Sequence, residues 1–91
     1  MKVWCLPINL PDPETEPEQA RAAGMFIGSL KGLKGVYKAE GCDVLAFDSI
    51  ECARGAKWRL EEYNATGLEI IEGRMTRDGK QVSLQRIVKG G

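Results

Sequence analysis

A hairpin signal near the C-terminus constrains the fold of this chain more than any other feature. Asp78-Gly79 lies between two β-prone runs, residues 68–76 and 81–88. Asp-Gly between such runs is typical of two antiparallel strands, because a tight turn needs residues that tolerate positive φ. Gly73, inside the first run, indicates a bulge or the close approach of another group.

A second hairpin is expected over residues 35–48. Two short β-prone runs flank Gly41 there, and glycine suits the first central position of a type II′ turn. The first strand of the chain is expected over residues 2–9, where apolar side chains alternate between two faces. Pro7 cannot donate a ladder hydrogen bond, so regular pairing should end or kink near Leu6.

Two amphipathic helices are expected between these strands. The first begins at a capping box formed by Thr15 and Glu18 and runs to about Lys31. The second begins at another capping box, residues 48–51, and covers residues 49–64. The side chains expected to face the core are Ala20, Ala23, Phe26, Ile27, Leu30 and Leu33 around the first helix, and Ile50, Ala53, Ala56, Leu60 and Tyr63 in the second.

The order of these elements predicts an α+β fold within a single domain, residues 1–91. A strand–helix–strand unit crosses over with a right-handed sense, which places both helices on one face of the sheet. We therefore expect a ferredoxin-like split βαβ sandwich with an added C-terminal strand (βαββαββ) and a mainly antiparallel sheet. The hydrophobic content, 43% of 91 residues, suffices for one small core.

Charge and side-chain chemistry narrow the function classes. Thirteen basic residues balance thirteen acidic ones, so net charge does not attract the chain to nucleic acid or to a membrane. Histidine is absent, which removes imidazole bases and histidine metal ligands. The chain has three cysteines, Cys5, Cys42 and Cys52, and no two of them have CxxC spacing. We therefore expect no disulfide, no bound metal and no cofactor. A cysteine-thiolate enzyme lacks a visible activating partner, and we expect no catalytic activity.

Targeting features are also missing from the sequence. Apolar runs are too short to span a bilayer, and residues 1–10 are too short an apolar stretch for a signal peptide. Unpaired cysteines suit a reducing compartment. These features predict a cytoplasmic location and no membrane partner.

Trp58 lies on the polar side of the second expected helix, among Glu51, Arg54 and Glu62. A large aromatic side chain among charges is typical of a protein contact, and Arg54 lies one turn away, where it can stack on the ring. We interpret this set as a contact surface for another protein or for a second copy of the chain. In the alternative interpretation, the C-terminal hairpin or residues 10–17 cover the indole. The sequence therefore predicts a small non-catalytic protein-interaction module.

Gly24 and Gly28 recur at the spacing of one helical turn within the first expected helix. An interior glycine lowers helix stability by about 1 kcal/mol relative to alanine, so such residues usually serve packing. We favour close packing of this stripe on the sheet or on the other helix. The alternative is a flat track for the backbone of a partner.

Basic side chains crowd the last hairpin. They are Arg74, Arg77, Lys80, Arg86 and Lys89. A twisted basic hairpin can contact phosphates, so weak nucleic-acid binding is the alternative function, although we favour protection of an edge strand. The RNA-recognition motif has a similar element order, but it stacks bases on aromatic side chains of its strands. Phe47 and Trp4 are the aromatic residues available for that purpose, and we interpret both as core.

Overall fold

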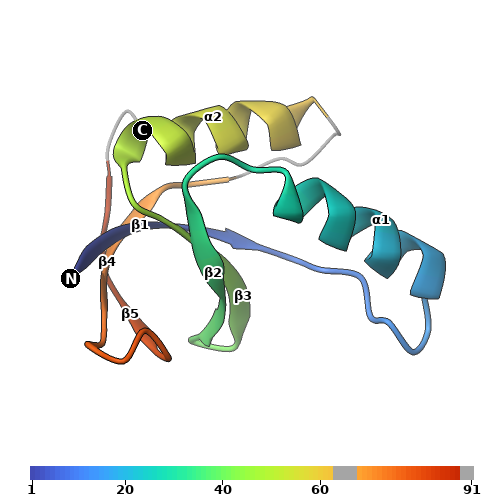
Figure 1. The fold of residues 1–91 in the computed structure, drawn as a ribbon, viewed down its shortest axis with the longest axis horizontal. Helices are drawn as coiled ribbons and strands as arrows, with labels where there is room; N and C mark the ends of the chain where they lie inside the picture. The colour runs from blue at the N-terminus through green and yellow to red at the C-terminus, as the bar shows by residue number, and fades with distance from the viewer. Residues whose placement is uncertain (63–67, 89–91) are drawn as a thin grey trace.

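The computed structural model describes residues 1–62 and 68–88, and shows two helices and a five-stranded sheet (Figure 1). In chain order the elements are β1 (Lys2–Ile8), α1 (Pro17–Gly28), β2 (Leu33–Ala39), β3 (Cys42–Phe47), α2 (Ile50–Glu61), β4 (Ile71–Met75) and β5 (Val82–Ile87). The strand order is β2-β3-β1-β4-β5, and each pair of neighbouring strands is antiparallel. The α+β class and the antiparallel sheet expected from the sequence are confirmed. The described residues do not include Tyr63, Lys89 or the part of the second expected helix that follows Glu62.

Pro7 is accommodated in the central strand because β1 has two neighbours along only part of its length. Pairing with β4 ends at Cys5, opposite Ile71, whereas pairing with β3 continues to Ile8, opposite Asp43. Pro7 therefore lies in a stretch with one neighbouring strand, where a residue without an N–H is tolerated. The early end of pairing that we expected occurs on the β4 side alone.

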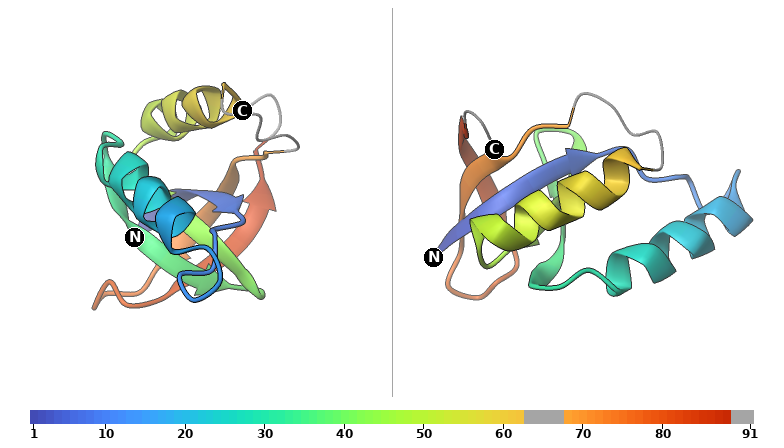
Figure 2. Two further views of the ribbon diagram at one scale, coloured as in Figure 1. Left: turned by 90° about the vertical axis from the view of Figure 1, so that its right-hand side faces the viewer. Right: turned by 90° about the horizontal axis from the view of Figure 1, so that it is seen from above.

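Both helices bury side chains against the same face of the sheet. Leu6 of β1 and Phe47 of β3 form one cluster with Ile27 of α1 and Ala53 of α2. Phe47 is fully buried, so its interpretation as core is confirmed. Figures 1 and 2 show α2 lying across the sheet, whereas α1 projects beyond it. The buried side chains of the α1 region, Ile27 and Leu30, accordingly come from its C-terminal end.

The opposite face of the sheet is covered by the edge strands, because the sheet curves and brings them together over that face. Val3, Val44 and Met75 are buried in a second apolar cluster on that face. The two edge strands, β2 and β5, approach each other there. The Tyr37 hydroxyl donates a hydrogen bond of 2.9 Å to the Gly79 carbonyl and so ties β2 to the loop before β5. This second cluster was not anticipated from the sequence.

The start of α1 differs from the prediction. Its N-cap is Glu16, whose side chain makes no capping hydrogen bond, so the capping box of Thr15 and Glu18 is wrong. The Glu16 amide instead donates to the Asp12 carbonyl at 2.7 Å, and the Glu14 amide donates to the Asp12 carboxylate at 2.9 Å. These hydrogen bonds turn the chain before the helix, and proline in the first turn needs no amide partner.

The end of α1 is also earlier than expected, at Gly28 rather than Lys31. The Ser29 hydroxyl donates to the Phe26 carbonyl at 2.6 Å, which satisfies one of the carbonyls at the helix terminus. Gly32 then adopts a φ of 77° and directs the chain into β2. Positive φ favours glycine, so the stop signal at Gly32 acts after the helix rather than within it.

Ser49 is the N-cap of α2, and its hydroxyl accepts a hydrogen bond of 3.2 Å from the Cys52 amide. The predicted start of this helix is thus confirmed, but the capping box of residues 48–51 is wrong by one position, because Ser49 rather than Asp48 is the N-cap. The hairpin between β2 and β3 is confirmed as well, but its turn is different. Glu40 and Gly41 have φ values of 52° and 78°, which defines a type I′ turn rather than type II′.

The bulge expected at Gly73 is confirmed. The register of β4 and β5 shifts between Glu72 and Gly73. A Cβ atom at Gly73 would lie 2.8 Å from the Ser83 carbonyl oxygen and 2.9 Å from Cys5 Sγ. Glycine at this position therefore lets β1, β4 and β5 approach one another closely.

Candidate interaction surface

Trp58 lies on the outer face of α2, and 65% of its surface is exposed. The inner face of the same helix buries Ala53 and Ala56 against the sheet. Because α2 has 3.6 residues per turn, a residue two positions after Ala56 projects to the far side. This exposure excludes the alternative in which residues 10–17 or the described part of the last hairpin cover the indole.

A shallow hollow of about 430 Å³ lies beside Trp58. Its apolar wall includes Leu30, Cys52 and Ala56. Gly55 also lines it, and a Cβ atom at that position would meet no atom within 4 Å. The hollow and the indole therefore lie side by side on one surface. This surface carries both a projecting side chain and a concave apolar region.

Three charged side chains border this hollow: Lys31, Glu51 and Arg59. The Arg59 guanidinium lies 5.0 Å from the centroid of the Phe26 ring, which links α2 to α1 and restricts the arginine. Glu51, in the first turn of α2, is exposed. Among the residues that the structure describes, the ion pairs join Lys2 to Glu72, Lys38 to Asp43 and Arg86 to Glu72, so Glu51 and Arg59 belong to none of them.

Arg54 and Glu62 are exposed on the outer face of α2, as expected. Stacking of Arg54 on the Trp58 indole is not observed. Within the described part of the chain, the cations over aromatic rings are Lys2 over Trp4 and Arg59 over Phe26. Arg59 stacks because α1 brings an aromatic ring to its side of α2.

Gly24 and Gly28 are both exposed on α1, and a Cβ atom at either would meet no atom within 4 Å. The favoured interpretation, close packing on the sheet or on the other helix, is therefore wrong, because α1 projects beyond the sheet. Both glycines line a separate hollow of about 330 Å³ with Val36 of β2. The structure does not bring them to the hollow beside Trp58.

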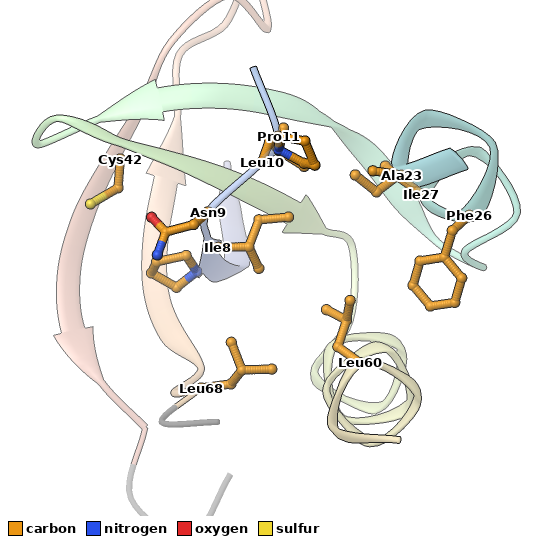
Figure 3. A pocket seen from close by; sticks show the side chains of 11 residues that line it. Ile8, Asn9, Leu10, Pro11, Ala23, Phe26, Ile27, Cys42, Leu60 and Leu68 are labelled. Atoms are coloured by element: carbon orange, nitrogen blue, oxygen red, sulfur yellow. The ribbon is translucent and has the colours of Figure 1, made fainter. Parts of the chain in front are cut away.

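A larger apolar groove of about 500 Å³ lies between α1, α2 and the end of β1. Figure 3 shows Ile8, Leu60 and Leu68 converging on it, with Ile27 closing it from α1. The groove exists because α1 projects away from the sheet instead of lying flat on it. The sequence does not specify that docking angle, so the groove was not anticipated.

The four described bases of the last hairpin, Arg74, Arg77, Lys80 and Arg86, are exposed, but acidic partners neutralise part of their charge. Glu72 lies 3.2 Å from Lys2 Nζ and 3.6 Å from Arg86 Nε. Arg74 is exposed and lies directly opposite Lys2 in the pairing of β1 with β4. Arg77 and Lys80 are exposed in the loop and lie on either side of Asp78 in the sequence. The described hairpin thus presents mixed charges rather than a basic stripe.

The three thiols occupy different environments. Burial raises the pKa of Cys5 to about 11, so this thiol stays protonated and weakly nucleophilic. Cys42 is exposed, and Cys52 is half-buried at the hollow beside Trp58. The described residues contain no group of three or more potential metal ligands. They also contain no helix long and apolar enough to cross a membrane.

Gly55 and Arg59 were not noted in the sequence as neighbours of Trp58, whereas Glu51 was placed on the same helix face. Gly55 carried a usable signal, because an interior helical glycine is unfavourable and lies three residues before Trp58. Arg59 carried none, since exposed charges are ordinary on the outer face of a helix. The placement of Glu51, Gly55 and Arg59 around one hollow depends on where α1 ends.

Comparison of this chain with protein-family models, with curated proteins and with solved structures gives no significant match.

Proposed function

We propose that this chain is a small non-catalytic protein-interaction module whose contact surface is the outer face of α2, centred on Trp58. The observation that carries the proposal is the exposed indole, 65% accessible, next to an unfilled apolar hollow. Tryptophan is enriched among the residues that dominate binding energy, because it buries a large area at a low entropic cost. Arg54 and Glu62 supply polar contacts around it, as at the rim of a typical interface.

The chemistry of the described side chains supports a non-catalytic role. The chain has no histidine to act as a base. The most buried thiol, Cys5, has a raised pKa, which opposes formation of a nucleophilic thiolate. We also propose a cytoplasmic location, supported by three cysteines that are free in the structure.

We further infer that the fold is a ferredoxin-like split βαβ sandwich with β5 added beyond β4. The strand order β2-β3-β1-β4 supports this inference, since each helix connects two strands that flank a third. Both helices pack on one face, as two right-handed crossovers require. In this arrangement the outer face of α2 is exposed to solvent and accessible to a partner.

The proposed surface can be tested with a photoreactive benzophenone amino acid at position 58. In cells, we expect irradiation to give one discrete protein adduct of the module, because the indole site is held against a partner. The same amino acid at position 25 is the matched control, since Met25 is 74% exposed on α1. Adducts that form equally at both positions, or at neither, would exclude a contact surface centred on Trp58.

The alternative function, weak nucleic-acid binding by the basic hairpin, has less support because Glu72 pairs with Lys2 and Arg86. We expect weak binding or none at physiological salt. Each phosphate contact would add to the salt dependence of the affinity. Sub-micromolar binding of DNA or RNA that is lost on charge reversal at Arg74, Arg77 and Lys80 would establish the alternative.

A further inference from the structure

We infer that the partner of the α2 surface is a second copy of this chain, bound through an antiparallel pair of α2 helices with a two-fold axis beside Gly55. This inference rests on the proposed function and adds the identity and geometry of the partner. Its basis is that one surface carries both the projecting Trp58 and the hollow that receives it.

Self-complementarity follows from two-fold symmetry. In a symmetric dimer the same patch meets itself, so every projection must face a hollow of the same patch. Trp58 lies three residues after Gly55, about one helical turn along α2. An antiparallel crossing at Gly55 brings the indole of each copy level with Cys52 of the other along the helix axis, over the part of the hollow that Glu51 and Gly55 line. Gly55 permits the close crossing, since nothing fills the space where its Cβ would lie.

Charge complementarity selects the antiparallel orientation. Glu51 and Arg59 lie four residues before and after Gly55, so the antiparallel crossing sets Glu51 of one copy opposite Arg59 of the other. Two such pairs form in each dimer. A parallel crossing in register would set like charges opposite each other, which is unfavourable. Both side chains border the hollow and take part in no ion pair among the described residues.

The stacking of Arg59 on Phe26 prepares this contact. The guanidinium is held 5.0 Å from the ring centroid before a partner arrives, so less side-chain entropy is lost on binding. Its N–H groups can donate to a carboxylate, which is the strongest acceptor that the patch offers. The patch is small, and two indoles bury only about 150–250 Å² each, so the dimer should be weak and concentration-dependent.

Cysteine crosslinking tests the position of the two-fold axis. Helix axes 8–10 Å apart place facing Cα atoms roughly 3.4–5.4 Å apart, which overlaps the range that a disulfide spans. In a Cys42→Ser, Cys52→Ala background, we expect Gly55→Cys to form a covalent dimer rapidly under mild oxidation. Gly24→Cys is the matched control, because Gly24 is also an exposed helical glycine with open space around it. Equal crosslinking rates at both positions would overturn the proposed axis.

Charge reversal tests the antiparallel pairing by sedimentation of the purified protein from micromolar to millimolar concentration. Glu51→Arg alone and Arg59→Glu alone should each weaken self-association by roughly tenfold or more, since like charges then face each other. The double variant should restore it, although both substitutions oppose the helix dipole and would not restore helix stability. Failure of the double variant to recover would exclude the pairing.

The outcomes separate this inference from the proposed function. If the wild-type chain stays monomeric at millimolar concentration, self-association is excluded. If position 58 then still gives an adduct, its mass must differ from twice that of the chain. Such an adduct would support the interaction surface but identify a different protein as its partner. A monomer without any adduct would exclude both proposals.

Discussion

Gly73 and Gly24 show how the surroundings of a residue, rather than its type, decide what it contributes. Both interrupt regular elements, and both were noted in the sequence as unusual positions. A Cβ atom at Gly73 would lie within 3 Å of the Ser83 carbonyl oxygen and Cys5 Sγ, whereas one at Gly24 would meet no atom within 4 Å. The first glycine is therefore needed by the sheet, and the second weakens a helix without improving its packing.

Opposite effects on stability are expected from alanine at these two positions. Gly73→Ala should lower the free energy of unfolding by about 1–3 kcal/mol, because the added methyl group overfills a packed site. Gly24→Ala should raise it by about 0.5–1 kcal/mol through the better helix propensity of alanine. Urea unfolding measures both values. If Gly73→Ala were neutral, the sheet could relax at the bulge and the close approach would not be structurally important.

Glu40 is a second residue at which local conformation and residue type disagree. It has a φ of 52°, and the other positive φ values in the described chain belong to glycines. Asparagine tolerates this conformation better than glutamate, and Asn-Gly is the preferred pair in a type I′ turn. Glu40→Asn should therefore raise the free energy of unfolding by about 0.5–1 kcal/mol. Glu40→Ala, which removes the charge but keeps the strain, should give no comparable gain.

At the scale of elements, the loop between β4 and β5 is organised by two side chains. The Thr76 hydroxyl donates to the Asp78 carboxylate at 2.6 Å and accepts from the Gln81 amide at 3.1 Å. The Lys80 amide donates to the same carboxylate at 3.0 Å. These hydrogen bonds explain why the Asp-Gly signal predicted the hairpin correctly, although the loop is longer than a two-residue turn.

This network predicts a pH dependence of the hairpin. Hydrogen bonds from the Thr76 hydroxyl and then the Lys80 amide lower the pKa of Asp78, so folding favours its carboxylate form. The stabilisation is complete above the ordinary pKa of aspartate and is lost as the pH falls through the lowered value. Amide chemical shifts of Lys80 in an acid titration should report this loss. Asp78→Asn should abolish that titration step, and its persistence in the variant would assign the step to another carboxylate.

At the scale of the whole molecule, the sheet separates two apolar clusters. One lies between the sheet and both helices, and the other lies under the curved edge strands on the opposite face. Val3 and Cys5 of β1 belong to the second cluster, while Leu6 belongs to the first. The central strand is therefore buried on both faces, and its exposure requires the sheet to open.

Thiol reactivity should report this organisation. Cys42, which is exposed, should react first with a thiol reagent, and the half-buried Cys52 should react more slowly. Cys5 is fully buried and has a pKa raised to about 11, so it should react only when the sheet unfolds. Mass spectrometry over increasing denaturant measures the three rates, with Cys42→Ser to assign the fastest. A Cys5 rate independent of denaturant would indicate local opening of β1 instead.

Part of the candidate site could be predicted from the sequence. Helical periodicity placed Trp58, Arg54 and Glu62 on the outer face of α2, because the apolar stripe fixes which side is buried. The hollow beside Trp58 could not be predicted, since it needs Leu30 and Lys31, which follow α1 and are far from α2 in the chain. The role assigned to Gly24 was wrong for the same reason, because it depended on the direction in which α1 leaves the sheet.

The sequence by itself determined the elements of this protein, their order and the antiparallel class of the sheet. Those features depend on interactions between residues close in the chain, such as the Ser49 cap, the 40–41 turn and the Asp78 turn. The tertiary structure alone decided the curvature of the sheet, the second apolar cluster and the projection of α1. These depend on contacts between residues far apart in the chain, such as Tyr37 with Gly79 and Arg59 with Phe26, whose geometry no local pattern specifies.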